Sequence, residues 1–331
     1  MKTNIRAVIP VAGVGTRLRP HTYALPKVLL NVAGKPILAH ILDKLVEYGV
    51  NDATIITGYM GDLVENFVRS KYPNIKVDFV EQKHMLGLGH AIWTGKDTYK
   101  EEESLFIILG DTVFDVDLRG AIDRNISSIG VKEVDDPRRF GVVLLDNNKI
   151  ISKFIEKPIE PISNLAIVGL YYIANSNNLK VALDTLISQN IRTKNEYQLT
   201  DALQLMLANG ERFNTFLVDG WYDCGKPETL LSTNKFLLAN YPIPKNIDGS
   251  VIIPPCFVAE DAHIENSIIG PYTSIASGCI VKDSIIKNSI ISYEAKVSNM
   301  LLNESIVGNE AEVYGVFDKL NVGNSSTIEL T

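Results

Sequence analysis

The segment Ala7–Pro20, AVIPVAGVGTRLRP, joins an apolar run directly to a loop with two glycines and two arginines. The apolar residues Ala7–Val11 predict a buried strand. Glycines directly after a strand let the backbone approach a phosphate closely, and the guanidinium of Arg17 can pair with two phosphate oxygens at once. The segment therefore predicts a phosphate-binding loop, although a purely structural turn would also suit two glycines after a strand.

Two well-defined phosphate loops do not fit this segment. A dinucleotide-binding fingerprint needs a third glycine at the position that Leu18 occupies. A P-loop needs Ser or Thr after Gly-Lys, whereas Gly34-Lys35 is followed by Pro36. The loop therefore belongs to neither of these classes.

The next hundred residues alternate strand and helix patterns. The predicted strands are Ala53–Thr57, Val77–Val80 and Leu105–Leu109, and the predicted helices lie around Ile37–Leu45, Leu63–Val68 and Ala91–Lys96. Such alternation predicts an α/β fold with a Rossmann-like, mixed but mostly parallel sheet and helices on both faces. Ligands are then expected at the carboxyl ends of the strands.

A different pattern begins at about Pro242. Helical periodicity ends there, and eleven apolar residues recur at intervals of five or six: Val258, Ile264, Ile269, Ile275, Val281, Ile286, Ile291, Val297, Leu302, Val307 and Val313. A repeat this short predicts a β-solenoid, with about three full coils and the start of a fourth. Because 331 residues exceed one ordinary core, we expect two domains, residues 1–241 and 242–331.

Composition narrows the class of protein. Hydrophobic residues make up 46% and charged residues 21%, and the net charge of −7 comes without a basic stripe, which argues against a nucleic-acid partner. No signal peptide and no apolar run of about 20 residues is visible, so we expect a cytoplasmic protein without a membrane partner. Cys224, Cys256 and Cys279 lack metal-ligand spacing and are expected to be buried thiols.

The sequence after the loop carries a family resemblance. The stretch Gly13–Leu38 continues with HTYALPKVLL (His21–Leu30) and VAGKPIL (Val32–Leu38). It resembles the signature of the sugar-phosphate nucleotidyltransferases, and it is most similar to the glucose-1-phosphate thymidylyltransferases and their uridylyl- and guanylyl-transferring relatives. The resemblance covers Ile5 to about Leu238. One departure, Pro10-Val11 in place of two small residues, is expected to alter only the end of the strand.

The solenoid resembles the left-handed β-helix of hexapeptide-repeat proteins, which longer members of the family also carry. Oligomerisation or regulator binding is the role that we expect for it, and a homo-oligomer is the expected assembly. An acyltransferase activity would need a catalytic histidine, and this part of the chain offers His263 alone.

The resemblance implies a reaction in which a sugar-1-phosphate oxygen attacks the α-phosphorus of a nucleoside triphosphate and pyrophosphate leaves. Alignment of two anions then needs cations and Mg²⁺. The implied catalytic residues are Arg17, Lys27, Asp111, Lys157 and Asp223, and the implied nucleotide-binding residues are Ala12, Gly13, Gly15, Thr16, Arg17, Gln82, Gly87 and Asp111. Their joint presence favours an enzyme over a non-catalytic regulatory relative that binds nucleotide-sugar.

Two aspartates are the expected ligands of the magnesium ion. Asp111 ends the apolar run Leu105–Asp111, and Asp223 lies in WYDCGKPE (Trp221–Glu228), which resembles the family's late Asp-x-Gly motif. A loop aspartate can also cap a turn, so the pairing of the two carboxylates carries the prediction. Thr112 follows Asp111 where many relatives carry Asn or Gly. This difference affects the contact made by residue 112, whereas the Asp111 carboxylate is retained.

The sugar-phosphate site is implied by Glu156-Lys157-Pro158. Lys157 would pair with the phosphate of the sugar, and Glu156 would accept hydrogen bonds from sugar hydroxyls. Other residues of this site are Gly141, Gly169 and Tyr171, of which Tyr171 fits a core position equally well. Thr200 and Asp201 are interpreted as helix caps.

Base choice is expected at Gln82 and the turn around Gly87. A glutamine can both donate to and accept from a pyrimidine edge, and Gly87 would let the base lie against backbone. This arrangement suits uracil and thymine, although guanine-using relatives can look similar here. The resemblance to the glucose-1-phosphate thymidylyltransferases favours dTTP with glucose-1-phosphate. UTP with glucose-1-phosphate and GTP with mannose-1-phosphate remain open.

Overall fold

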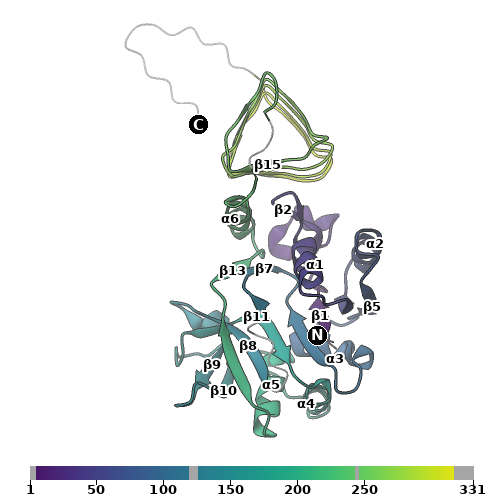
Figure 1. Cartoon of the computed structure of the whole chain (residues 1–331), viewed down its shortest axis with the longest axis vertical. Coiled ribbons are helices and arrows are strands. Elements are labelled where there is room, and N and C mark those ends of the chain that lie inside the picture. Colours follow the sequence, from purple (N-terminus) through teal and green to yellow (C-terminus); the bar gives the residue numbers. More distant parts are fainter. Residues whose placement is uncertain (1–4, 119–125, 243–245, 317–331) are drawn as a thin grey trace. The chain divides into compact units, whose positions relative to one another are not determined.

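The computed structural model describes residues 5–118, 126–242 and 246–316 (Figure 1). The chain packs as two compact units, one from residues 1–30 and 35–233 and the other from 31–34 and 234–331. The change of unit falls between Thr233 and Asn234, within helix α6 (Pro227–Leu238). The predicted domain division at residues 241 and 242 stays a prediction, and each unit is described by itself below.

The first unit is built on a mixed sheet with the strand order β10-β9-β11-β6-β1-β4-β5. Its parallel half consists of β6, β1, β4 and β5, which confirm the four strands predicted from the sequence. Their bounds are β1 (Ile5–Pro10), β4 (Asp52–Thr57), β5 (Lys76–Glu81) and β6 (Ser104–Ile108). The carboxyl ends of these strands therefore lie along one edge of the sheet.

The other half of the sheet is largely antiparallel. Strand β11 pairs antiparallel with β6, β8 and β9, β10 pairs antiparallel with β9, and β12 runs parallel to β8. A separate two-stranded ribbon joins β7 and β13. The bounds are β7 (Thr112–Asp115), β8 (Ser127–Glu133), β9 (Gly141–Leu145), β10 (Ile151–Glu156), β11 (Leu165–Ile173), β12 (Phe213–Leu217) and β13 (Gly220–Asp223). Two short strands precede α1: β2 (Asn31–Val32), which belongs to the second unit, and β3 (Lys35–Pro36).

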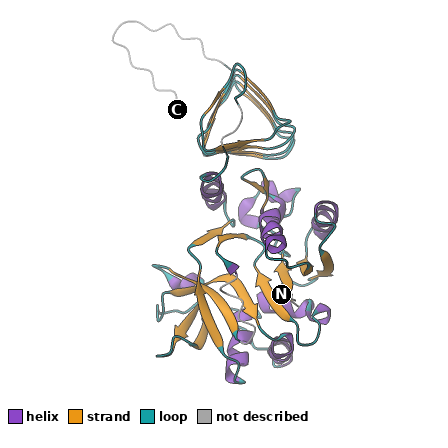
Figure 2. Ribbon diagram, in the orientation of Figure 1, coloured by secondary structure: helices purple, strands orange, loops and turns teal. Residues whose placement is uncertain are grey.

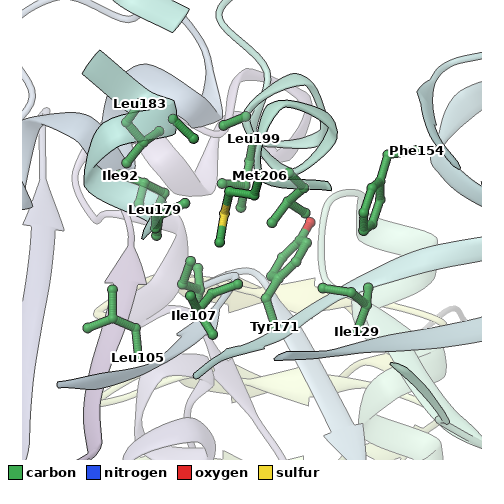
Figure 3. Packing of buried hydrophobic residues seen from close by; sticks show 14 of the residues in the cluster. Ile92, Leu105, Ile107, Ile129, Phe154, Tyr171, Leu179, Leu183, Leu199 and Met206 are labelled. Carbon is green, nitrogen blue, oxygen red and sulfur yellow. The ribbon is translucent and has the colours of Figure 1, made fainter. Parts of the chain in front are cut away.

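Helices flank the sheet, as Figure 2 shows, and alternate residues of each central strand meet different helices. In β1, Val8 faces a cluster with α3, α4 and α5, whereas Ala7 and Ile9 face one with α1 and α2. Figure 3 shows the first of these clusters. The helices are α1 (Ile37–Glu47), α2 (Gly61–Lys71), α3 (Leu88–Thr94), α4 (Ser176–Ser188) and α5 (Leu199–Ala208). Burial on both faces explains why β1, β4 and β6 are mainly apolar, whereas the edge strand β5 carries exposed charged residues.

Short 3₁₀ turns fill several connections of the first unit. Three of them follow β1 in succession, so the glycine-rich loop leads into a compact, folded segment. The bounds are η1 (Thr16–Leu18), η2 (His21–Tyr23), η3 (Lys27–Leu29), η4 (Lys96–Thr98) and η6 (Pro137–Arg139).

The second unit contains a prism of three parallel sheets, each with four strands, and Figure 1 shows its triangular cross-section. Each strand pairs in register with the equivalent strand of the next coil, for example Ile269 with Ile286 and Ile286 with Leu302. The strands are β14 (Val251–Ile252), β15 (Cys256–Val258), β16 (His263–Glu265), β17 (Ile268–Ile269), β18 (Thr273–Ile275), β19 (Ile280–Lys282), β20 (Ile285–Lys287), β21 (Ile290–Ile291), β22 (Lys296–Ser298), β23 (Leu301–Asn303), β24 (Ile306–Val307) and β25 (Glu312–Tyr314). This is the arrangement of the predicted left-handed β-helix.

The predicted repeat positions form the core of this prism. All eleven belong to its apolar cluster, with Val258, Leu302 and Val313 only partly buried. The described residues hold one strand more than the predicted repeat counted, because β14 precedes Val258 and its Ile252 also packs against the cluster. The β-helix therefore has four coils in the described residues, where about three and part of a fourth were predicted.

Two further expectations concern the whole chain. Among the residues that the structure describes, no helix has the length and hydropathy needed to cross a bilayer. The thiols of Cys224, Cys256 and Cys279 are free and buried, as predicted.

Candidate active site

Two adjoining cavities open in the first unit. The larger has a volume of about 660 Å³ and the smaller about 470 Å³. Both are lined by Arg17, Leu88, Leu109 and Asp111, so these residues mark the place where the cavities meet. Two ligands, one in each cavity, could therefore meet end to end at this junction.

The candidate residues divide between the two cavities. Every residue expected to bind nucleotide lines the smaller one, together with Lys27. Every residue expected to bind sugar phosphate lines the larger one, together with Asp223. The sequence reasoning therefore grouped residues that the fold does place together, although they come from segments far apart in the chain.

The glycine-rich loop owes its shape to Gly15. Its φ of 68° lies in the left-handed region, and an added Cβ would lie 3.0 Å from the Cβ of Lys27 and 3.1 Å from Thr22. The Thr22 hydroxyl donates to the Gly15 carbonyl at 2.9 Å and fixes the turn. Gly13, by contrast, has open space around it, and Arg17 is exposed. The loop is thus held in place at Gly15, whereas Gly13 and Arg17 are exposed and accessible to an anion.

The departure at Pro10-Val11 leaves this loop intact. Strand β1 ends at Pro10, and the Val11 N–H donates to the Ile56 carbonyl at 2.8 Å. The Val11 side chain packs where a Cβ on Gly110 would stand, at 2.5 Å. The glycine before Asp111 thus makes room for the larger residue.

Lys27 is buried rather than solvated. Only 7% of the residue is exposed, and its Nζ lies 2.6 Å from Asp111 Oδ2. The Asp111 side chain is 40% exposed, so the carboxylate also faces the cavity. A buried lysine needs such a partner because removal from water penalises its charge. Lys27 therefore does not behave as an ordinary solvated surface lysine.

Asp223 reaches the same junction through the β7–β13 ribbon. Its register partner is Thr112, and the Cys224 N–H donates to the Asp111 carbonyl at 2.9 Å. A Cβ added to Gly225 would lie 2.8 Å from Asp223 Oδ1 and 3.0 Å from the Arg17 guanidinium. The absence of a side chain at Gly225 therefore lets the carboxylate and the guanidinium approach each other.

The two aspartates fit a magnesium ion that is completed by substrate. Among the described residues, no group of three or more His, Cys, Asp or Glu side chains forms a complete metal site. Mg²⁺ typically takes one or two carboxylates and fills its remaining positions with water and substrate phosphates. Asp111, directly before β7, and Asp223, at the end of the paired strand β13, line one cavity and provide that donor set.

Glu156 is held in the larger cavity by Thr200. The Thr200 hydroxyl donates to Glu156 Oε2 at 2.7 Å, and Lys157 Nζ lies 3.3 Å from Oε1. A Cβ on Gly141 would lie 2.9 Å from the Thr200 hydroxyl and 3.0 Å from Oε2. Gly141 thus leaves space for this pair of side chains.

This finding corrects the interpretation of Thr200 and Asp201 as helix caps. Helix α5 begins at Leu199, its N-cap position is Gln198, and no side chain caps it. Asp201 has a buried Oδ2 without a hydrogen-bond partner among the described residues. Burial, followed by the Glu156 carboxylate, raises the pKa of Asp201, and a hydrogen bond with Thr193 opposes that shift.

The backbone of Lys157 is strained in a way that aims its side chain. Its φ of 44° lies in the left-handed region, which non-glycine residues seldom adopt. The Lys157 N–H donates to the Phe140 carbonyl at 3.0 Å and holds this conformation directly after β10. The lysine therefore leaves the strand with its ammonium beside Glu156, at the wall of the larger cavity.

Tyr171 is both a core residue and a wall of the larger cavity. It is 4% exposed and belongs to the apolar cluster of Figure 3, where its phenol points away from β11. Burial, followed by the Glu156 carboxylate, raises the pKa of the Tyr171 phenol, so the hydroxyl stays protonated. Nearby, Gly169 has a φ of 85° within the irregular pairing of β11 with β8. Any Cβ there would lie 2.7 Å from Leu109.

Gln82 lies at the wall of the smaller cavity and is 3% exposed. Its Nε2 is 3.2 Å from the Gly87 carbonyl oxygen and 3.0 Å from His90 Nδ1. Gly87 has a φ of 111°, and a Cβ there would lie 2.6 Å from the Tyr197 carbonyl. Gly87 is therefore required by the backbone of Tyr197 as well as by its place in the cavity wall.

The sequence reasoning missed several residues of the larger cavity. Arg139 and Lys226 add two cations to its lining. Trp221 also lines it, and its buried indole N–H has no hydrogen-bond partner among the residues that the structure describes. Lys226 and Trp221 stand inside the quoted motif around Asp223, so their neighbourhood was a usable signal. Arg139 lies in the turn η6, and no motif near it in the sequence pointed to the site.

Cys224 is inert in its present surroundings. It is fully buried, and its Sγ lies 3.7 Å from the Thr233 hydroxyl. Burial raises the pKa of the Cys224 thiol to about 12. Proximity to Asp223 in the sequence therefore does not make this thiol a nucleophile.

Comparison with known proteins agrees with this geometry. The model of the nucleotidyl transferase family matches residues 6–240. The bifunctional protein GlmU of Methanocaldococcus jannaschii is 34% identical over 91% of this chain and 77% of its own length. The UTP–glucose-1-phosphate uridylyltransferase AglF of Haloferax volcanii is 32% identical over 68% of this chain and 93% of its own.

A solved structure shows the same likeness. A putative glucose-1-phosphate thymidylyltransferase from Bacillus anthracis, crystallised in complex with a sucrose, superimposes with a TM-score of 0.61 at 27% identity. The match covers 73% of this chain and 98% of that one. On these grounds the chain belongs to the nucleotidyl transferase family and is an enzyme of its sugar-1-phosphate nucleotidyltransferase type.

Proposed function

We propose that this enzyme joins dTTP to glucose-1-phosphate and releases pyrophosphate. The observation that carries the proposal is the pair of cavities that meet at Arg17 and Asp111. In this arrangement the nucleotide occupies the smaller cavity and the sugar phosphate the larger. Their reacting ends then meet at the junction, where cations and carboxylates are gathered.

The reaction forms one bond and breaks one. An oxygen of the sugar-1-phosphate attacks the α-phosphorus of the triphosphate, and the bond from that phosphorus to the bridging oxygen of pyrophosphate breaks. Arg17 binds the departing pyrophosphate, and Lys157 binds the sugar phosphate. Because both substrates are anions, the work of the protein is to align them and to offset their repulsion.

Asp111 and Asp223 would hold the magnesium ion. When bound, the ion supplies positive charge that the phosphates share in the transition state. Lys27, paired with Asp111 in the structure, stands beside the same phosphates. Its burial keeps its ammonium in place, so little reorganisation is needed on binding.

Substrate choice rests on two side chains. Gln82 offers hydrogen bonds to a pyrimidine edge in the smaller cavity, and Glu156 accepts from sugar hydroxyls in the larger. UTP with glucose-1-phosphate is the alternative pair that the same residues suit, and GTP with mannose-1-phosphate keeps the mechanism with other substrates. The β-helix is proposed to serve homo-oligomer assembly.

The test is pyrophosphate release with Mg²⁺ present. Glucose-1-phosphate is offered with dTTP, UTP and GTP separately, and mannose-1-phosphate is offered with GTP. We expect the highest kcat/KM with dTTP and glucose-1-phosphate. Preference for GTP with mannose-1-phosphate would overturn the substrate choice. Nucleotide binding without release from any pair would favour a regulatory protein instead.

A further inference from the structure

The side-chain amide of Gln82 has one orientation in this structure. Its Nε2 contacts two groups, the Gly87 carbonyl oxygen at 3.2 Å and His90 Nδ1 at 3.0 Å. A carbonyl oxygen can only accept, so Nε2 must be the amide atom that faces it. The reversed amide would bring the oxygens of Gln82 and Gly87 together. Gly87 therefore identifies the nitrogen end of the amide.

This orientation determines the tautomer of His90. Since the Gln82 amide nitrogen carries two hydrogens and no acceptor pair, His90 Nδ1 must accept the second hydrogen. His90 is then neutral, with its proton on the other ring nitrogen. Both hydrogens of the Gln82 amide are thus engaged by the protein.

The oxygen of the same amide is left for a ligand. Among the described residues, none donates a hydrogen bond to Gln82 Oε1, and Gln82 lines the smaller cavity. Gln82 can therefore only accept from a base, which suits the N3–H of uracil or thymine. A glutamine that was free to turn could offer either end.

We propose that His90 is a positioning residue for base recognition: its neutral ring holds the Gln82 amide so that Oε1 alone meets the base, and protonation of the ring abolishes this selection. Protonated His90 would present an N–H to the Gln82 N–H, so the amide would have to turn or withdraw. A turn would bring Oε1 against the Gly87 carbonyl, so either response removes the acceptor. The inference rests on the proposed function in that it places the base beside Gln82.

The surroundings of His90 keep the ring neutral near pH 7. Burial lowers the pKa of His90, and the charges of His84 and Arg192 lower it further. The ring stacks on Tyr197 with centroids 6.3 Å apart, and Trp93 lies 5.8 Å away on its own helix. Arg192 is fixed over the Tyr197 ring at 4.2 Å and donates to its hydroxyl at 2.9 Å.

These facts give the sign of the pH dependence. Because the pKa is lowered, His90 is neutral at and above pH 7 and becomes charged only as the pH falls below its usual range. Base recognition is therefore complete at neutral pH and weakens on the acid side. Burial and the charges of His84 and Arg192 all act in this same direction.

Two substitutions at His90 test separately its role as a hydrogen-bond acceptor and the effect of its protonation. Asparagine places an amide oxygen where Nδ1 stands and does not titrate, whereas leucine removes the acceptor and keeps the bulk. The control is His84→Asn, at an exposed histidine of the same segment that is not among the hydrogen-bond partners of Gln82 in the described residues. Because the charge of His84 lowers the pKa of His90, this variant should move the acid-side fall to higher pH without removing it. The probe is N3-methyl-UTP, which lacks the N3–H that Oε1 would accept.

We expect H90L to raise KM for UTP and dTTP about tenfold, the effect of losing one oriented hydrogen bond. Its kcat and its KM for glucose-1-phosphate should stay within about twofold, and its discrimination against N3-methyl-UTP should fall by the same factor of about ten. H90N should keep wild-type discrimination and lose the acid-side fall in discrimination that the wild type shows as the pH drops below the usual range of a histidine. H84N should retain that fall.

The inference is overturned if H90L discriminates as the wild type does, or if H90N keeps the acid-side fall. Calorimetric binding of UTP and N3-methyl-UTP to the same three variants measures the effect without turnover. A wild type that binds UTP selectively but releases no pyrophosphate would refute the proposed function and leave the His90 proposal standing. A wild type that turns over UTP, together with an H90L variant that discriminates as the wild type does, would refute the His90 proposal and leave the proposed function standing.

Discussion

The ammonium of Lys27 lies 2.6 Å from the carboxylate of Asp111, on a lysine that is only 7% exposed. One residue follows the first strand and the other follows the fourth strand of the parallel half, 84 positions later. The pair therefore ties the glycine-rich segment to the end of β6, at the junction of the two cavities.

Replacement of Asp111 by asparagine should lower kcat on the order of 100-fold or more, because it removes a metal ligand and leaves Lys27 buried without its partner. Pyrophosphate release over a range of Mg²⁺ concentrations measures the loss. The control is Asp115→Asn, an exposed aspartate of the adjoining strand β7. Full activity of D111N would refute the metal role.

Replacement of Thr200 by valine should raise KM for the sugar phosphate about tenfold and leave KM for the nucleotide unchanged. The valine has the same shape but cannot donate to Glu156, so the carboxylate is no longer held. Thr185→Val is the matched control, since that hydroxyl donates only to the Val181 carbonyl within α4. An equal rise in both KM values would argue against a sugar-side role.

Alanine at Gly225 should lower kcat on the order of 100-fold with the fold preserved. Its methyl group would meet the Asp223 carboxylate at 2.8 Å and the Arg17 guanidinium at 3.0 Å, so one of them must move. Steady-state kinetics and circular dichroism together check this expectation. Wild-type kcat in a folded G225A would show that the closeness of Arg17 and Asp223 is not needed.

The native enzyme should resist thiol reagents near neutral pH. All three cysteines are buried, and burial raises the pKa of Cys256 and Cys279 to about 11 and that of Cys224 to about 12. A raised thiol pKa leaves little thiolate until the pH is far above neutral. Mass spectrometry after N-ethylmaleimide should show no adduct on the folded chain and full labelling in denaturant. Rapid labelling of the folded chain would contradict this.

Two adjacent isoleucines of β20 should differ sharply in their effect on stability. Ile286 is fully buried in the prism, whereas Ile285 beside it is 42% exposed. Ile286→Ala should lower the free energy of unfolding of the second unit by about 2–5 kcal/mol, and Ile285→Ala by less than about 1 kcal/mol. Calorimetric unfolding of the two variants makes the comparison. Equal destabilisation would mean that the strand's inward and outward faces are wrongly assigned.

Sequence reasoning succeeded where the physical constraint is local. The inward positions of the β-helix repeat within a few residues, and the loop glycines adjoin the strand that they follow. It failed where a constraint joins distant segments. Thr200 bonds Glu156 from 44 positions away, and nothing in the sequence near either residue indicates the other. The cap interpretation of Thr200 used the local rule and missed the tertiary one.

The same contrast explains the glycines. A positive φ at Gly15 or Gly87 is a local demand that a turn pattern can suggest. Gly141 and Gly225 have another reason. Gly141 leaves space for Thr200 and Glu156, and Gly225 leaves space for Arg17, and each of these side chains comes from a distant segment. The residues that fill a space can be found only after the chain has brought them together.

The in-register coils of the second unit have a consequence for how this protein can change. The Ser284 N–H donates to Ser267 Oγ at 3.1 Å, and the Met300 N–H donates to Ser284 Oγ at 3.1 Å, so the same bond recurs from coil to coil. Insertion or loss of one whole coil would leave each remaining coil with an equivalent neighbour. The length of the prism is therefore free to vary in evolution by units of one coil. The catalytic sheet, whose neighbours β1 and β6 are separated by almost a hundred residues, has no comparable unit to gain or lose.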